Sequence, residues 1–313
     1  MGVAVIGERV DDYLLLDSLI NKAAQGNSST VAVAAAEDIE VIEAVIAALD
    51  QNLAKFMLFG DEEKINSIFE SKKQNISSDC LKIIHAHSNA EAAELAVKAV
   101  FNKEASVLMK GNISTNTFLK AVLNKEYGLR TGNVLSHISV FEILGFNRFT
   151  IITDAAMNIA PDLEQKAQII RNAVSLARSI GIEIPKVAPI AAVEVVNPAM
   201  QATLDAAALT VMNRRGQILD CIVDGPLGLD NAISTLAAEH KGIHSEVAGN
   251  ADILLVPTIE VGNALYKSLI YFANAKVGAV IAGAKAPIVL TSRADTAESK
   301  LYSLALALCC TTK

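Results

Sequence analysis

Short apolar runs that alternate with helical patterns are the feature that most constrains the fold of this chain. Residues 30–36, 56–60, 81–85 and 105–110 are such runs, rich in Val, Ile, Leu, Phe and Ala. In the segments between them, for example 90–102, apolar side chains recur at helical spacing. Strands buried on both faces have this composition, and strands that alternate with helices form parallel βαβ units. The sequence therefore predicts an α/β fold with mostly parallel sheets.

The alternation changes in the middle of the chain. Residues 134–142 and 149–153 both have strand-like patterns, and too few residues separate them for a helix. They indicate an antiparallel element or a crossing between domains. Alternation then resumes, with strands expected at 186–190, 218–223, 251–256 and 279–282 and helices at 163–180, 198–213 and 263–273. At 313 residues with no flexible linker, two α/β domains that share an interface are expected.

Composition excludes several classes of protein. Hydrophobic residues make up 52% of the chain and charged residues 19%, which favours a large core and excludes global disorder. The apolar runs are shorter than the roughly 18 residues that a membrane span needs, so no membrane association is expected. A net charge of −7 and the absence of Trp disfavour a nucleic-acid partner.

The N-terminus and the cysteines bear on the compartment. Residues 1–13 lack a basic segment followed by a long apolar core, so no secretory signal is predicted. Cys80, Cys221, Cys309 and Cys310 contain no C-x-x-C pair, which disfavours a zinc site or a disulfide framework. Free thiols fit a reducing compartment, and a cytoplasmic location is therefore expected.

Residues 286–300, APIVLTSRADTAESK, form a candidate anion site. A buried strand is predicted first, and a helical pattern begins at about Thr296. Ser292 and Arg293 lie between the two, and Ser292 with Asp295 has the spacing of a helix cap. A hydroxyl, a guanidinium and free backbone N–H groups at a helix start can bind an anion. The alternative is an ordinary junction in which Ser292 caps the helix and Arg293 is solvated.

The stretch KGNISTNT forms a second candidate site. A strand is predicted to end at Lys110, and Gly111 permits a close backbone turn. Ser114 and Thr115 stand at the start of the next helix, and Lys120 lies one turn into it. Such a loop can hold a phosphate group. The alternative is a capped βα loop with a surface lysine. Neither the Walker A motif nor the G-x-G-x-x-G fingerprint occurs in the chain.

Other polar residues are weaker candidates. Asp224 and Asn263 follow predicted strands, and ligands of open α/β sheets bind beyond the carboxyl ends of strands. These strand ends make a site if they cluster, and ordinary turns if they do not. His240 and His244 have helical spacing, but Lys-Gly between them disfavours a helix, and no metal site is expected. His137 is predicted to be a structural or surface residue.

Six blocks of sequence resemble the phosphate acetyl/butyryltransferase family. They are KGNIST (110–115), GNVLSHISVFE (132–142), VNPAMQATLDAAALTVMNRRGQI (196–218), DGPLGLDNA (224–232), PTIEVGNALYK (257–267) and PIVLTSRADTAESK (287–300). They occur in the family's order and cover most of the chain, from about residue 80 to the end. The fourth and sixth blocks are most similar to the phosphate butyryltransferase branch.

The resemblance implies a two-domain α/β/α fold of the isocitrate/isopropylmalate dehydrogenase-like type, with an inter-domain cleft. Residues 1–134 with 288–313 are then the first domain, and 135–287 the second, which supplies dimerisation and part of the cleft. It also implies a homodimer or larger oligomer. The implied reaction moves a short acyl group between coenzyme A and inorganic phosphate, with no covalently bound cofactor and no metal.

The resemblance also assigns roles to residues. Ser292 and Arg293 match the family's Ser-Arg pair, and Lys120 stands where the acetyltransferases carry an arginine. The predicted phosphate- and CoA-binding residues are Lys110, Gly111, Ser114, Thr115, Lys120, Asp224 and Asn263. Gapless counting puts Ser299 at the acetyltransferases' aspartate, so the catalytic base is left between Asp295 and Glu298.

The expected mechanism is direct attack of phosphate on the thioester carbonyl within a ternary complex. Arg293, Lys120 and helix N-termini offset the developing charge. Ser292 hydrogen-bonds the departing sulfur, and Asp295 or Glu298 moves the proton. Two alternatives stay open: an NAD- and metal-dependent hydroxy-acid dehydrogenase on the same fold, and an inactive CoA-binding homologue.

Overall fold

The computed structural model describes residues 15–25, 29–72, 79–290 and 295–311. The strands are β1 (Thr30–Ala34), β2 (Lys55–Gly60), β3 (Leu81–His85), β4 (Val107–Lys110), β5 (Ser136–Glu142), β6 (Thr150–Thr153), β7 (Lys186–Pro189), β8 (Ile222–Val223), β9 (Ile253–Leu255), β10 (Lys276–Ala282) and β11 (Ile288–Val289). The helices are α1 (Leu16–Gln25), α2 (Ile39–Asp50), α3 (Glu62–Ser71), α4 (Asn89–Phe101), α5 (Thr115–Val122), α6 (Leu163–Ser179), α7 (Gln201–Arg214), α8 (Leu229–Ile233), α9 (Thr235–His240), α10 (Ile259–Tyr271) and α11 (Ala297–Cys309).

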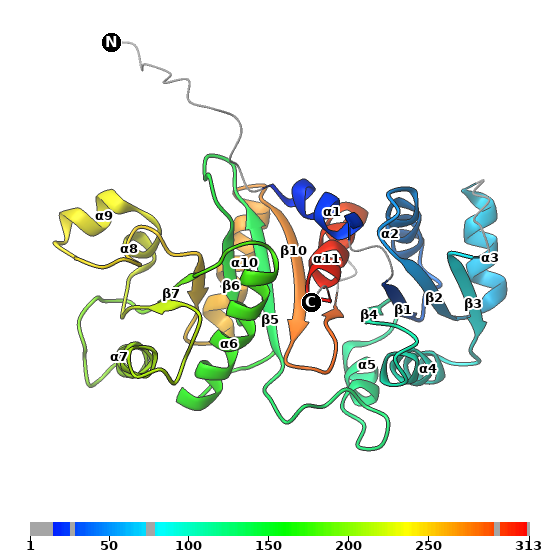
Figure 1. Cartoon of the computed structure of the whole chain (residues 1–313), viewed down its shortest axis with the longest axis horizontal. Helices are drawn as coiled ribbons and strands as arrows, with labels where there is room; N and C mark the ends of the chain where they lie inside the picture. The colour runs from blue at the N-terminus through cyan, green and yellow to red at the C-terminus, as the bar shows by residue number, and fades with distance from the viewer. Residues whose placement is uncertain (1–14, 26–28, 73–78, 291–294, 312–313) are drawn as a thin grey trace, which may run out of the picture.

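In the described ranges all the strands belong to one twisted sheet, which runs along the length of the molecule (Figure 1). The order is β3-β2-β1-β4-β11-β10-β5-β6-β9-β7-β8. The neighbouring strands β3, β2, β1, β4 and β11 are parallel to one another. The strands β6, β9, β7 and β8 form a second parallel group. β10 is antiparallel to both β11 and β5, and β5 is antiparallel to β6. The predicted α/β class is confirmed, and β5 with β6 is the predicted antiparallel element.

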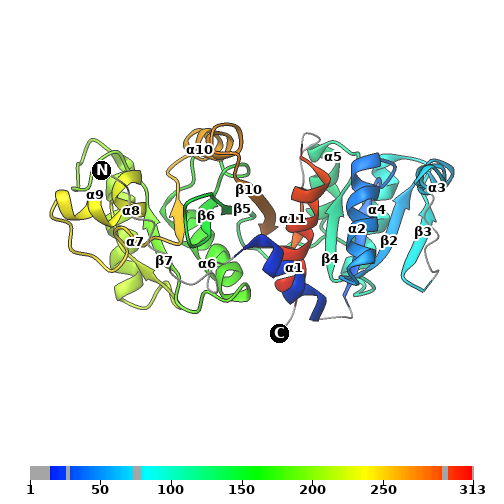
Figure 2. The same cartoon turned by 90° about the horizontal axis from the view of Figure 1, so that it is seen from above.

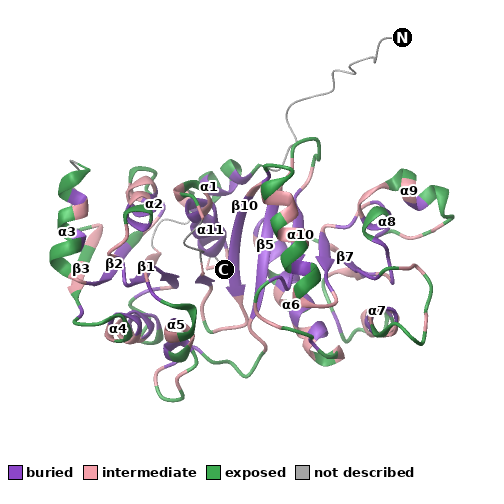
Figure 3. Ribbon diagram, turned by 180° about the vertical axis from the view of Figure 1, so that it is seen from behind, coloured by how far each residue is buried: buried purple, intermediate pink, exposed green. Residues whose placement is uncertain are grey.

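Helices cover both faces of the sheet (Figure 2). α1, α2, α3, α6, α7 and α11 pack on one face, while α4, α5, α8, α9 and α10 pack on the other. Most of the helices turn an apolar stripe to the sheet and an outer face to solvent, whereas α11 is buried nearly all round beneath α1 and α2 (Figure 3). α2, for example, buries Val41, Ile42, Val45 and Ala48. No helix in the described part of the chain is long and apolar enough to cross a membrane.

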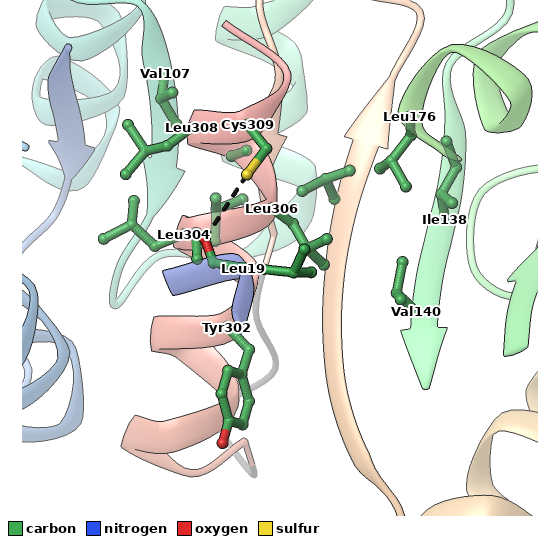
Figure 4. Packing of buried hydrophobic residues seen from close by; sticks show 14 of the residues in the cluster. Leu19, Val107, Ile138, Val140, Leu176, Tyr302, Leu304, Leu306, Leu308 and Cys309 are labelled. Carbon is green, nitrogen blue, oxygen red and sulfur yellow. Dashed lines mark hydrogen bonds between the residues drawn. The ribbon is translucent and has the colours of Figure 1, made fainter. Parts of the chain in front are cut away.

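The C-terminal segment returns to the strands of the N-terminal half. Ile288 of β11 pairs with Leu108 of β4, and α11 packs on the face of the sheet over β10, where its leucines belong to one buried cluster with Val107 and Ile138 (Figure 4). The packing is close at Gly278 of β10, because an added Cβ would lie 2.9 Å from the backbone carbon of Tyr302 in α11. The C-terminal strand and helix therefore complete the sheet between β4 and β10.

Two predictions of local structure were wrong, and one helical region was not predicted. The strand expected at 218–223 is only Ile222–Val223. Asp220 has a left-handed φ of 62°, and the side-chain amide of Asn213 donates hydrogen bonds to the carbonyls of Ile218 and Cys221. The α8–α9 helix pair was not expected from the sequence. The cap of the last helix is Thr296, whose hydroxyl accepts from the Ser299 N–H at 3.2 Å, and not Ser292.

Candidate active site

A pocket of about 690 Å³ opens over the centre of the sheet, between α5 and α10. The strands β4, β5 and β10 supply Lys110, His137, Val277 and Ala279 to its floor, and Leu290 lines it directly after β11. The register places Leu108, Ile288, Ile281 and His137 in one row across these strands. A volume of several hundred cubic ångströms suits a small-molecule substrate. The wall is partly apolar, with Ile113, Ala155, Ala156, Ile270, Val277, Ala279 and Leu290.

The loop after β4 supplies one side of the pocket. Lys110 is 5% exposed, lines the pocket and donates from Nζ to the Gly111 carbonyl at 3.2 Å. Gly111 lies so close to β1 that an added Cβ would be 2.1 Å from the Ala35 carbonyl oxygen. Only glycine fits this approach, which fixes the path of the loop. The loop is therefore held rigidly against β1 just before it reaches the helix.

Ser114 is the N-cap of α5, and its Oγ accepts from the Thr117 N–H at 3.1 Å. Ser114 and Thr115 both line the pocket, so the N-terminus of α5 opens toward it. The first N–H groups of a helix lack intrahelical acceptors and carry partial positive charge. With the Lys110 ammonium beside them, these groups can bind an anion such as phosphate.

The structure separates the other predicted binding residues. Asn263 of α10 lines the pocket. Lys120 is exposed in the last turn of α5 and is not among the pocket residues. Asp224 follows β8 at the far edge of the sheet, where its carboxylate lies 3.8 Å from Arg214. The strand ends that carry Asp224 and Lys110 therefore do not cluster.

The two predicted carboxylates lie in different surroundings. Asp295 lines the pocket, and its backbone carbonyl accepts from the buried Nζ of Lys300. Glu298 does not line the pocket, because its Oε1 is 2.9 Å from the Tyr302 hydroxyl and 3.7 Å from the Lys276 ammonium. Ser292 and Arg293 lie outside the described residues. Leu290 and Asp295, the described residues on either side of them, both line the pocket.

Sequence reasoning missed His137 and Tyr266 as pocket residues. His137 is 7% exposed on β5, and its ring meets the Tyr266 ring edge-on at 6.0 Å between centroids. Burial lowers the pKa of His137, although the Asp154 and Asp295 carboxylates act against that shift. Burial and Asp295 raise the pKa of Tyr266. The available signal was polarity: Ser136, His137 and Ser139 lie in a mostly buried strand that also contains Ile138, Val140 and Phe141.

Ser299 also lines the pocket, with Thr296 and Ser303 on the same helix. A serine hydroxyl there offers a hydrogen bond but not the basicity of a carboxylate. Among the residues that the structure describes, no group of three or more His, Cys, Asp or Glu is placed to hold a metal ion.

Comparison with known proteins identifies relatives along nearly the whole chain. The family model described as phosphate acetyl/butaryl transferase matches residues 15–100 and 84–308. A probable phosphate butyryltransferase of Bacillus subtilis (strain 168) is 58% identical, over 94% of this chain and 97% of its own length. A phosphate acetyltransferase of Thermotoga maritima is 48% identical, over 94% of this chain and 98% of its own.

Solved structures agree with these matches. A branched-chain phosphotransacylase from Enterococcus faecalis V583 aligns with a TM-score of 0.79 at 37% identity, covering 90% of this chain and 99% of that one. A 4-hydroxythreonine-4-phosphate dehydrogenase from Klebsiella pneumoniae aligns with a TM-score of 0.53 at 11% identity, covering 91% and 99%, which shows a shared fold alone. This chain is therefore a member of the phosphate acetyl/butaryl transferase family.

Proposed function

We propose that this protein moves a short, butyryl-type acyl group between coenzyme A and inorganic phosphate, by direct attack in a ternary complex. The observation that carries the proposal is the pocket in which Lys110, the α5 N-terminus and Asp295 meet, in a member of this family. A cation and free N–H groups suit a phosphate, and the apolar wall suits a short alkyl chain. Acyl-CoA and phosphate are the substrates, with no covalently bound cofactor.

In this proposal phosphate lies at the α5 N-terminus, with Lys110, Gly111, Ser114 and Thr115. A phosphate oxygen attacks the thioester carbonyl, the new C–O bond forms, and the C–S bond breaks to release CoA. Fixed donors beside the carbonyl stabilise the tetrahedral oxyanion, and one such donor typically contributes ~10²–10³ in rate. Arg293 and Ser292 remain the proposed charge-stabilising and sulfur-binding residues.

The structure supports some of the other proposed site residues and not others. Asn263 and Asp295 belong to the pocket, which supports their proposed contacts with substrate. Lys120 and Asp224 lie away from the described pocket wall, and Glu298 is held by Tyr302. We therefore place Asp295 rather than Glu298 beside the reacting groups. The match to the transferase family does not favour the dehydrogenase alternative.

The decisive experiment measures free thiol released from acetyl-, propionyl-, butyryl-, isobutyryl- and octanoyl-CoA, with and without phosphate. Phosphate-dependent release that is fastest with four-carbon chains supports the proposal and its butyryl specificity. Equal release without phosphate indicates a hydrolase instead. No release from any thioester favours the inactive CoA-binding homologue.

Two further proposals concern the setting of the enzyme. The four cysteines, all within the described residues, are free thiols, which fits a cytoplasmic enzyme. The family resemblance favours a homodimer or a larger homo-oligomer. Light scattering coupled to size-exclusion chromatography distinguishes these states from a monomer.

A further inference from the structure

His137 lies at the floor of the pocket, and one of its ring nitrogens has no hydrogen bond to any described residue. Its Nδ1 is fully buried and has no hydrogen-bond partner among the residues that the structure describes. Buried polar atoms are nearly always paired, and unpaired ones in native proteins often serve catalysis or bind a missing ligand. A purely structural histidine would be expected to pair both ring nitrogens, so this one needs another explanation.

The backbone of His137 is fixed by a hydrogen bond, and its ring has one aromatic neighbour. The Thr153 hydroxyl donates to the His137 carbonyl at 2.9 Å, which joins β5 to β6 at this point. The Tyr266 ring packs edge-on against the imidazole from α10. A side chain with its backbone and ring both fixed can meet a substrate with little reorganisation.

Charged groups face the imidazole from several elements. The Asp154 carboxylate after β6 is fixed by the N–H groups of Ala156, Met157 and Asn158 and by the Asn158 amide. Asp295 faces the pocket from the start of α11, Lys110 from β4, and Tyr266 and Lys267 from α10. Burial lowers the pKa of His137, which favours a neutral ring at rest. The two carboxylates favour the imidazolium once a proton arrives.

An imidazole is also better matched to a thiol than a carboxylate is. Ordinary pKa values are about 3.9 for Asp, about 6.5 for His and about 8.5 for a thiol. Proton transfer is most effective when the pKa of the base lies near the working pH. Asp295 is well placed to stabilise a cation on His137, because its carboxylate acts to raise the pKa of that ring.

We propose that His137 is the proton-transfer residue of the acyl transfer. The inference rests on the proposed function and deepens it. With acyl phosphate and CoA as reactants, His137 accepts the S–H proton as the sulfur attacks the carbonyl and the C–S bond forms. The C–O bond to phosphate then breaks, and the imidazolium returns the proton to the departing phosphate. In the opposite direction the same proton passes from the attacking phosphate to the departing CoA sulfur.

The test is His137→Gln, assayed from pH 6 to pH 10 in the thiolysis direction, with the exposed His244→Gln as the control. We expect the turnover of His137→Gln at pH 7 to fall about 10²–10⁴-fold, the range for a lost acid–base group, with the KM for CoA changed only a few-fold. Toward pH 10 a growing fraction of the CoA thiol ionises without help, so the defect should shrink by at least about tenfold. His244→Gln should match the wild type throughout.

The outcomes separate the two proposals. An inactive wild-type enzyme defeats the proposed function itself. An active wild type with normal turnover and pH profile in His137→Gln overturns the role of His137. A defect of equal size at every pH also overturns it, because that result indicates a structural role.

A measurement on the unmodified protein guards against a variant that fails to fold. The chain has five histidines, so their imidazole proton resonances can be followed individually by NMR. Single substitutions of His85, His87, His240 and His244 assign four of them, and the remaining resonance belongs to His137. We expect this resonance to shift on addition of CoA. A resonance that does not respond to CoA at saturation contradicts the proposal.

Discussion

Asp295 and Glu298 are three residues apart, yet the fold gives them different surroundings. Asp295 faces the pocket, whereas Glu298 is bound to the Tyr302 hydroxyl beside Lys276 and Asp17. Asp295→Asn should therefore lower turnover by ~10² or more, because it removes the charge that stabilises a protonated partner in the pocket. Glu298→Gln should stay within a few-fold of the wild type.

Both variants are compared in the thiol-release assay, at saturating acyl-CoA and phosphate. Each substitution changes one carboxylate to an amide of equal size, so each is the matched control of the other. A larger loss in Glu298→Gln than in Asp295→Asn would show that the pocket assignment is wrong.

Pocket residues in a loop motif were easier to predict than pocket residues inside a buried strand. Lys110, Ser114 and Thr115 were found because a strand end, a glycine and hydroxyls at a helix start signal an anion site locally. His137 was missed because its place depends on long-range pairing, which sets it opposite Ile281 of β10. Asp224 also follows a strand and precedes a glycine, but its strand β8 lies at the edge of the sheet, away from the pocket. Local chemistry was readable in the sequence, while strand order was not.

At the scale of elements, two helices on the same face of the sheet offer a controlled comparison. Ser114 caps α5 beside the pocket, and Ser88 caps α4 away from it, each through one backbone N–H at about the same distance. Ser114→Ala and Ser88→Ala should each lower stability by about 0.5–2 kcal/mol, because each leaves one helix N–H without its acceptor.

Only Ser114→Ala should also weaken phosphate use. Loss of one hydrogen bond to a charged group costs about 1.5–3 kcal/mol, so the KM for phosphate should rise by about one to two orders of magnitude. Urea unfolding measures the first effect, and initial rates over a phosphate series measure the second. A raised KM for phosphate in Ser88→Ala would mean that the effect comes from stability and not from the site.

Most elements were predictable because their periodicity is strong and their ends carry caps. Asp38, Ser88 and Asp162 each accept a hydrogen bond from the first turn of the helix that follows. β8 was overestimated because an apolar run does not reveal the left-handed turn at Asp220. The cap of α11 was misplaced because Ser292 and Thr296 both precede the helix, and spacing alone did not choose between them.

At the scale of the whole molecule, the two halves share one core. We propose that 1–134 with 288–313 and 135–287 are the two structural units of the chain. Yet a single cluster of buried residues joins Val107 and Leu304 of the first unit to Ile138 and Val140 of the second (Figure 4). α11 lies on β10 across the boundary, and the sheet is continuous through it.

We therefore expect one cooperative unfolding transition rather than two, because neither unit can open without exposing the shared core. Calorimetry should give equal calorimetric and van't Hoff enthalpies, at a protein concentration where the oligomer does not change. Leu306→Ala removes a buried side chain of α11 that packs against β10, and it should cost about 2–5 kcal/mol. If the halves are coupled through this contact, the variant lowers the midpoint of the whole transition. Two separate unfolding transitions, or a shift in only part of the transition, would instead mean that the units unfold independently. In that case α11 stabilises only the unit that contains it.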